Sequence, residues 1–166
     1  MNKLQNVILE IIYQISNVEG VFDFGNDTLR GLQNYIGRHS LANDQYYVSE
    51  DAFASFGEFG LTVPLRRSKL KDLKRYFTYE HPVPKNVVAN YIKNSNRTLP
   101  EIKKILEFAD YVILVTKDED KKLNQLHRHK MPSDWIYFEG SKLARYESVG
   151  IKIRTEKISV TGRILV

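Results

Sequence analysis

The chain has 166 residues, of which 42% are hydrophobic and 27% charged, a balance that is ordinary for a globular protein and argues against disorder. It contains no cysteine, which excludes disulfides, thiolate zinc sites and a cysteine nucleophile. The formal net charge of +5 favours a polyanionic partner.

The N-terminal segment carries Glu10 inside its apolar part and has no small-residue cleavage site, so it predicts no signal peptide. No run approaches the roughly 18 apolar residues that a membrane span needs, and we expect a cytoplasmic location. The length suits one domain. We therefore expect a single domain over 1–166, with a mainly helical part at 1–60, a central unit at 66–130 and a C-terminal β-hairpin region at 131–166.

The first part of the chain predicts helices. Residues 3–18 carry apolar side chains at helical spacing: Leu4, Val7, Ile8, Ile11, Ile12 and Ile15. A second helix is expected to begin at Asn26 or Asp27 as N-cap. Residues 38–48 are predicted to be a polar loop, and Ser49 is expected to cap a short helix that ends near Phe56.

A basic run follows between Arg66 and Arg75, RRSKLKDLKR, with six cationic residues in ten and one acid. Ser68 is expected to cap a helix over this run. A solvated basic helix is common, but this one leads directly into an aromatic and β-branched strand at 76–81, which ends at Pro82. The expected contacts to nucleic-acid phosphates are Arg66, Arg67, Lys69, Lys74 and Arg75.

The second half predicts a mixture of helices and strands. Two helices are expected at 85–94 and 99–108, and the best buried strand at 111–115. A capping box, Thr116 to Glu119, begins a helix that should end near Leu126. The tail 149–166 alternates apolar and polar residues around a glycine and predicts a β-hairpin. The fold class is therefore α+β.

Four polar residues stand at the ends of these central elements. Strand 76–81 finishes with Glu80 and His81, and the helix after 111–115 carries Asp120 and Asn124 one turn apart on one face. Hard oxygen ligands suit a divalent cation such as Mg²⁺, and a neutral histidine can take a proton from an attacking water. This combination is typical of phosphodiester hydrolysis.

At these residues the chain resembles the HNH endonucleases, which have the ββα-metal fold. The segment 110–124, DYVILVTKDEDKKLN, resembles their strand-and-helix half, with Thr116 and Glu119 at the turn, and YEHPVP resembles their first strand end. The resemblance covers about 45 of the 166 residues. It implies a strand, strand and helix unit, here with about 30 residues of helical insertion between the two strands.

The same resemblance implies the roles of the residues. His81 would be the general base, and Glu80, Asp120 and Asn124 would bind Mg²⁺ or another divalent cation. The implied substrate is double-stranded DNA, and the implied protein is a restriction, phage or mobile-element enzyme.

Several other interpretations stay open. Glu80 and His81 also suit a simple strand end, and Asp120 and Asn124 the wet face of a lysine-rich helix. A second nuclease pattern, Asp110 with Glu119-Asp-Lys121, ranks lower because the capping box places Glu119 in a helix. The helix dipole accounts for the surface histidines after this helix, His127 and His129, and His39 is uninformative.

Two other functions are also compatible with the sequence. The chain can be a non-catalytic DNA-binding regulator or phage accessory protein that uses the basic run. It can instead be a protein-interaction or inhibitor module that docks through the N-terminal amphipathic helix. If the chain forms a homodimer, the N-terminal helices are the expected contact.

Overall fold

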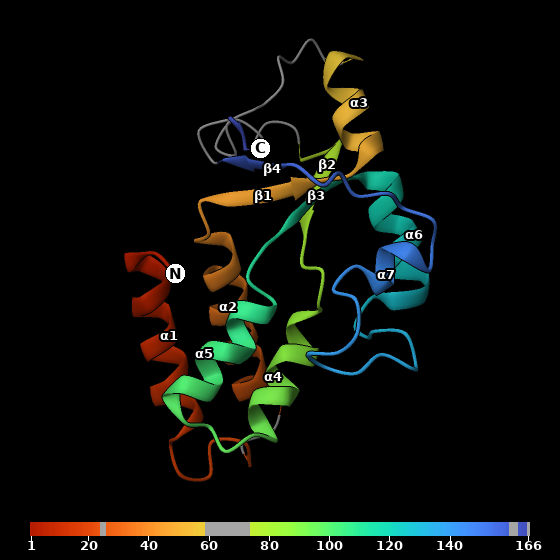
Figure 1. Ribbon diagram of the computed structural model, residues 1–166. Helices are drawn as coiled ribbons and strands as arrows, with labels where there is room; N and C mark the ends of the chain where they lie inside the picture. The colour runs from red at the N-terminus through yellow and green to blue at the C-terminus, as the bar shows by residue number, and fades with distance from the viewer. Residues whose placement is uncertain (24–25, 59–73, 160–162, 166) are drawn as a thin grey trace.

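A computed structural model describes residues 1–23, 26–58, 74–159 and 163–165, so most of the basic run lies outside the described residues. The chain is an α+β protein in which a group of helices lies at one end of a small mixed sheet (Figure 1). Across the described ranges no helix is long and apolar enough to cross a membrane.

The helical end is built from four helices, α1 (Lys3–Ser16), α2 (Asn26–Leu41), α4 (Lys85–Lys93) and α5 (Leu99–Phe108). Their apolar faces form one core, which includes Ile12, Leu32, Ile36, Val88, Ile92, Ile102 and Ile105. The predicted helices are confirmed, although α2 continues to Leu41, where a loop from residue 38 was expected. Leu4 and Val7 on the outer face of α1 are exposed, and the homodimer through this helix stays a prediction.

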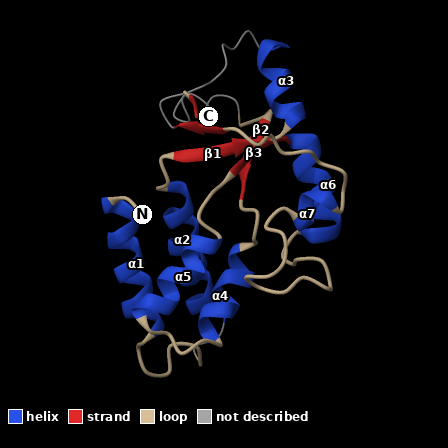
Figure 2. Cartoon of the chain, viewed as in Figure 1, coloured by secondary structure: helices blue, strands red, loops and turns tan. Residues whose placement is uncertain are grey.

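The sheet contains β1 (Gln45–Val48), β2 (Phe77–Glu80), β3 (Ile113–Thr116), β4 (Lys157–Ser159) and β5 (Ile164–Leu165) in the order β2-β3-β1-β4-β5 (Figure 2). Only β1 and β3 pair in parallel among these strands. The predicted strands at 76–81 and 111–115 are confirmed, and so is the antiparallel pairing in the tail.

The position of β1 corrects the sequence prediction, which placed residues 38–48 in a polar loop. This strand lies in the middle of the sheet, and its Tyr46 and Val48 side chains are buried. The flanking Asn43 and Asp44 gave the segment the composition of a loop, whereas its aromatic and β-branched residues fit a pleated, half-buried surface.

Both faces of the sheet are covered, which explains the uninterrupted apolar run of β3. Leu114 packs with Phe56 of α3 (Glu50–Glu58) on one face. Ile113 and Val115 pack on the other face with Leu123 of α6 (Lys117–His127) and with α7 (Ala144–Glu147). The four-residue helix α7 was not predicted.

The predicted strand, strand and helix unit is formed by β2, β3 and α6. In the antiparallel β2–β3 pair Phe77 lies opposite Thr116, and Glu80 opposite Ile113. The capping box is confirmed, because Thr116 and Glu119 exchange hydrogen bonds of 3.2 and 2.8 Å with each other's backbone N–H. The insertion between the two strands contains α4 and α5, which belong to the core of the helical end.

Ser49 joins the beginnings of α3 and α6 through two buried hydrogen bonds. Its Oγ donates to Glu119 Oε2 at 2.6 Å and accepts from the backbone N–H of Ala52 at 3.1 Å. We expect Ser49→Ala to lower the free energy of unfolding by about 1–2 kcal/mol, because it removes a helix cap and a hydrogen bond to a buried carboxylate. Urea denaturation measures this change.

The matched control is Ser55→Ala in the same helix. The Ser55 hydroxyl donates to the Asp51 carbonyl one turn earlier, at 2.7 Å, in an exposed setting. Its loss should change the free energy of unfolding by less than about 0.5 kcal/mol. Equal effects of the two substitutions would contradict a special role for Ser49.

Candidate functional site

The ends of β2 and α6 bring two of the predicted carboxylates together. Glu80 is the last residue of β2, and Asp120 lies in the first turn of α6, close enough for its carboxyl group to raise the pKa of Glu80. Asn124, one turn further along, donates its Nδ2 to Asp120 Oδ1 at 2.7 Å. Glu80, Asp120 and Asn124, the three predicted metal ligands, therefore form one connected group.

Burial raises the pKa of the Glu80 carboxyl to about 7. The positive charge of Arg145 opposes this rise, whereas the negative charge of Asp120 and the hydrogen bond between the two carboxyl groups add to it. The pair therefore keeps a proton on Glu80 far above the usual pH range of a glutamic acid. Two carboxylates held this close are stabilised by a shared proton or by a cation.

The His81 ring lies near α2 and the start of α4. Its Nε2 would lie 3.6 Å from a Cβ placed on Gly37 of α2, and the ring lies near Lys85 at the start of α4. Burial, followed by the charge of Lys85, lowers the pKa of His81 to about 4, so the imidazole is neutral at pH 7. Nε2 is buried without a well-formed hydrogen bond to any described residue.

Two residues of α7 complete the site, and no sequence pattern pointed to them. Arg145 is 1% exposed, donates from Nη1 to the His81 carbonyl at 2.9 Å, and has Nη2 at 3.8 Å from Glu80 Oε2. Tyr146 is fully buried, and burial, followed by the charge of Glu80, raises its pKa well above the usual value. Tyr146 therefore stays a neutral phenol beside the carboxylates.

A polar cavity of about 330 Å³ opens at this point and is called the Glu80 cavity below. Its lining includes Glu80, His81, Asn124, Lys85, Arg128 and Arg145. The predicted base and two predicted ligands, Glu80 and Asn124, thus line the same cavity, although Asn124 comes more than 40 positions after the other two. His129, which the sequence analysis assigned to the helix dipole, also lines the cavity, while His127 Nε2 is bonded to Ser148 Oγ at 2.8 Å.

The predicted phosphate contacts lie at the opposite end of β2 or outside the described residues. Arg66, Arg67 and Lys69 fall in the undescribed segment, and Lys74 is exposed. Arg75 lies over the ring of Tyr76 at 4.6 Å.

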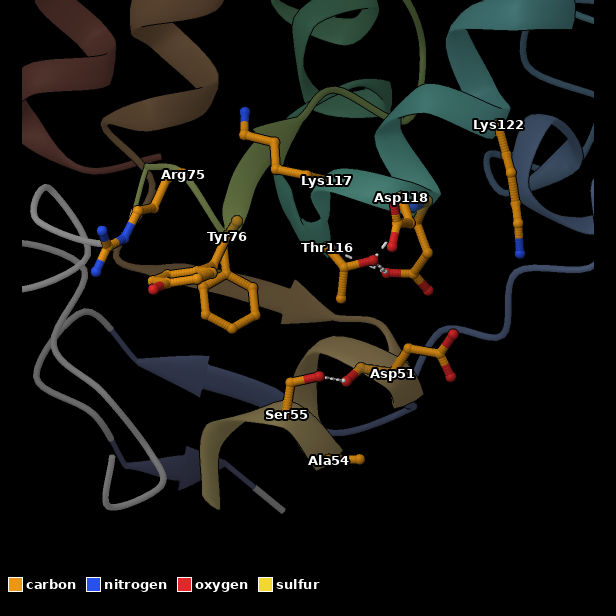
Figure 3. Close-up of a pocket in the computed structure, with 11 residues that line it drawn as sticks. Asp51, Ala54, Ser55, Arg75, Tyr76, Thr116, Lys117, Asp118 and Lys122 are labelled. Atoms are coloured by element: carbon orange, nitrogen blue, oxygen red, sulfur yellow. Dashed lines mark hydrogen bonds between the residues drawn. The ribbon is translucent and has the colours of Figure 1, made fainter. Parts of the chain in front are cut away.

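Arg75 also lines a second cavity of about 700 Å³, together with Lys117, Lys122, Asp51 and Asp118 (Figure 3). The four residues of β2, about 13 Å in length, separate this cavity from Glu80. The described part of the basic run therefore stands away from the carboxylate pair.

The structure argues against the alternative nuclease pattern of Asp110 with Glu119. Asp110 accepts a hydrogen bond from Gln5 Nε2 at 2.6 Å and lies 3.2 Å from His39 Nδ1. Glu119 is 2% exposed and is bonded to Ser49 and Thr116. The two acids lie before and after β3, each inside its own structural network.

The donor set fits a hard divalent cation. The carboxyl groups of Glu80 and Asp120 interact electrostatically. Asn124 bonds to Asp120 through its Nδ2, so this bond does not use the amide oxygen of Asn124. Mg²⁺ commonly uses one or two carboxylates and keeps several waters. Within the described ranges no group of three or more His, Asp or Glu side chains is placed to hold a metal ion.

Comparison of the chain with protein-family models, with curated proteins and with solved structures found no match in any of the three. The functional argument therefore depends on the chemistry of the site itself.

Proposed function

We propose that this protein is a divalent-metal-dependent DNA endonuclease of the HNH type. The observation that carries the proposal is the electrostatic coupling of the Glu80 and Asp120 carboxyl groups in a β2–β3–α6 unit. A strand, strand and helix unit with ligands at this end is the arrangement that the sequence resemblance implies.

The residues of the site would divide the work as follows. Glu80, Asp120 and the Asn124 amide oxygen would hold the cation, which supplies positive charge to the phosphate and to the leaving oxygen. His81 is neutral at pH 7 and would take the proton of the water whose oxygen attacks phosphorus. The P–O bond to the leaving nucleoside then breaks, and Tyr146 and Arg145 keep the Glu80 end of the site dry and oriented.

A plasmid-cleavage assay tests the proposal. The wild-type protein should nick or linearise DNA with Mg²⁺ or Mn²⁺ and should stop when EDTA is added. Asp120→Ala should lower the rate by roughly 10²-fold at low metal concentration and recover part of it at high Mn²⁺, because the substitution weakens metal binding.

The matched control is Asp118→Ala, which removes an exposed carboxylate from the same helix, away from Glu80. It should cleave like the wild type. A wild type that never cleaves DNA, or two aspartate variants that behave alike, would overturn the proposal.

The direction of the His81 ring favours one second candidate, a non-catalytic DNA-binding protein. The ring lies beside Gly37 of α2. In that case the protein should bind duplex DNA with an affinity that falls steeply with salt and should leave it intact.

A further inference from the structure

The beginning of α4 lacks the features that normally neutralise a helix N-terminus. Its N-cap is Pro84, no side chain bonds to the first turn, and the first turn contains no acidic residue. The first helical residue is instead a lysine, Lys85, which the helix dipole disfavours there. The first backbone N–H groups of a helix attract an anion where they have no intrahelical partner. In α4 the Val87 N–H donates to the Pro84 carbonyl at 2.9 Å, so the groups left for an anion are those of Lys85 and Asn86.

This helix N-terminus opens into the Glu80 cavity. Pro84, Lys85 and Asn86 all line the cavity, so the first turn of α4 forms part of its wall. Arg128 adds a second exposed cation to the same wall. Asn86 is held in place by a 2.6 Å hydrogen bond from its Nδ2 to the His129 carbonyl, which joins α4 to the segment after α6.

Arg145 gives an independent indication of an anion. Its side chain is 1% exposed and lines the cavity, yet Nε and Nη2 have no hydrogen-bond partner among the described residues. Glu80 Oε2, at 3.8 Å from Nη2, is too distant for a hydrogen bond. Buried donors of a charged group are costly to leave unpaired, and a planar guanidinium is well matched to a phosphate.

We propose that the Glu80 cavity binds a phosphate group through Arg145, Lys85 and the N-terminal N–H groups of α4. The volume of about 330 Å³ is at the small end for ligand pockets and suits one phosphate with its sugar. This site would place a phosphate beside the carboxylate pair and so adds to the proposed function. Only the role of this phosphate in cleavage rests on that function; the binding of phosphate does not.

The test uses the full chain in EDTA at low salt, with inorganic phosphate as the probe in a calorimetric titration. The wild type should bind phosphate saturably. Arg145→Gln should weaken binding at least tenfold and Lys85→Gln about fivefold, because each removes a cation from the site. Lys93→Gln, at the other end of α4, is the matched control and should bind like the wild type.

Arg145 is buried, and its loss can unfold the chain, so the fold of Arg145→Gln must be checked by circular dichroism. If that variant is unfolded, Lys85→Gln alone tests the proposal. An absence of saturable phosphate binding in the wild type would overturn the proposal. An equal loss in Lys93→Gln would overturn it too, since it would show a diffuse charge effect.

Competition with nucleic acid identifies the source of the phosphate. Displacement by a duplex without terminal phosphates assigns the site to an internal phosphodiester, and displacement only by a 5′-phosphorylated oligonucleotide assigns it to a terminal phosphate. If neither displaces phosphate, the assignment to nucleic acid is wrong. A separate Mn²⁺ titration of the carboxylate pair distinguishes this failure from a failure of the proposed nuclease, because the phosphate test contains no metal.

Discussion

His81→Ala is expected to lower the rate of DNA cleavage by roughly 10²–10⁴-fold while the chain stays folded. This loss corresponds to about 3–5 kcal/mol of transition-state stabilisation. The reason is that His81 lines the Glu80 cavity and its ring is neutral at pH 7, as a proton acceptor must be. Single-turnover cleavage of a labelled duplex measures the effect.

Two accompanying measurements separate a base from a structural residue. Mn²⁺ binding should be unchanged in His81→Ala, because the proposed mechanism gives His81 no role in holding the cation. His127→Ala is the control, since that ring bonds to Ser148 and lies outside the lining of the cavity. If His81→Ala cleaves at the wild-type rate, or loses activity only because it unfolds, His81 is not the base.

We compare the free energies of unfolding of Glu80→Gln and of the wild type in the absence of divalent cations. The difference is expected to shift in favour of the variant by about 2–3 kcal/mol as the pH is raised from 5 to 8. Folding raises the pKa of Glu80 from 4.5 to about 7, so the folded chain holds this proton more tightly than the unfolded chain. The corresponding stability is present at low pH and is lost as the pH rises toward 7 and above. Glutamine does not titrate and escapes the loss.

Urea denaturation of both proteins in EDTA, at several pH values, measures this difference. His81 has a lowered pKa and contributes the opposite pH dependence, but it does so in both proteins and cancels to a first approximation. Addition of Mn²⁺ at pH 8 should stabilise the wild type and not the variant. Glu10→Gln, an exposed change on α1, should show a difference that is constant with pH, and a constant difference for Glu80→Gln would contradict the prediction.

Elements with strong local signals could be predicted from the sequence. The capping box fixed the beginning of α6, and the continuous apolar run identified β3, since both depend on neighbouring residues. The strand β1 could not be predicted, because its place in the middle of the sheet is decided by partners at 112–114 and 158–159. The phosphate contacts expected from the basic run stay a prediction, because most of that run lies outside the described residues.

The candidate site shows the same division. The meeting of Glu80 and Asp120 follows from an antiparallel strand pair with a helix after its second strand, which the sequence pattern implied. The direction of the His81 ring depends on Gly37, 44 positions earlier in the chain, and the Arg145 contacts depend on a four-residue helix without a pattern. Long-range packing of this kind leaves no local signal.

Because of the helical insertion between β2 and β3, the site depends on two hydrophobic cores, that of the sheet and that of the helical end. Glu80 and Ile113 pair across 33 positions, and between them α4 and α5 pack against α1 and α2. Closing so long a loop costs only about 0.6 kcal/mol for each doubling of its length, so the barrier lies in ordering the insertion rather than in its size. Contact order is therefore high for the functional centre, which we expect to assemble late, after the N-terminal helices have collapsed with the insertion. A fragment of residues 74–130 would lack α1 and α2, the helices against which α4 and α5 pack.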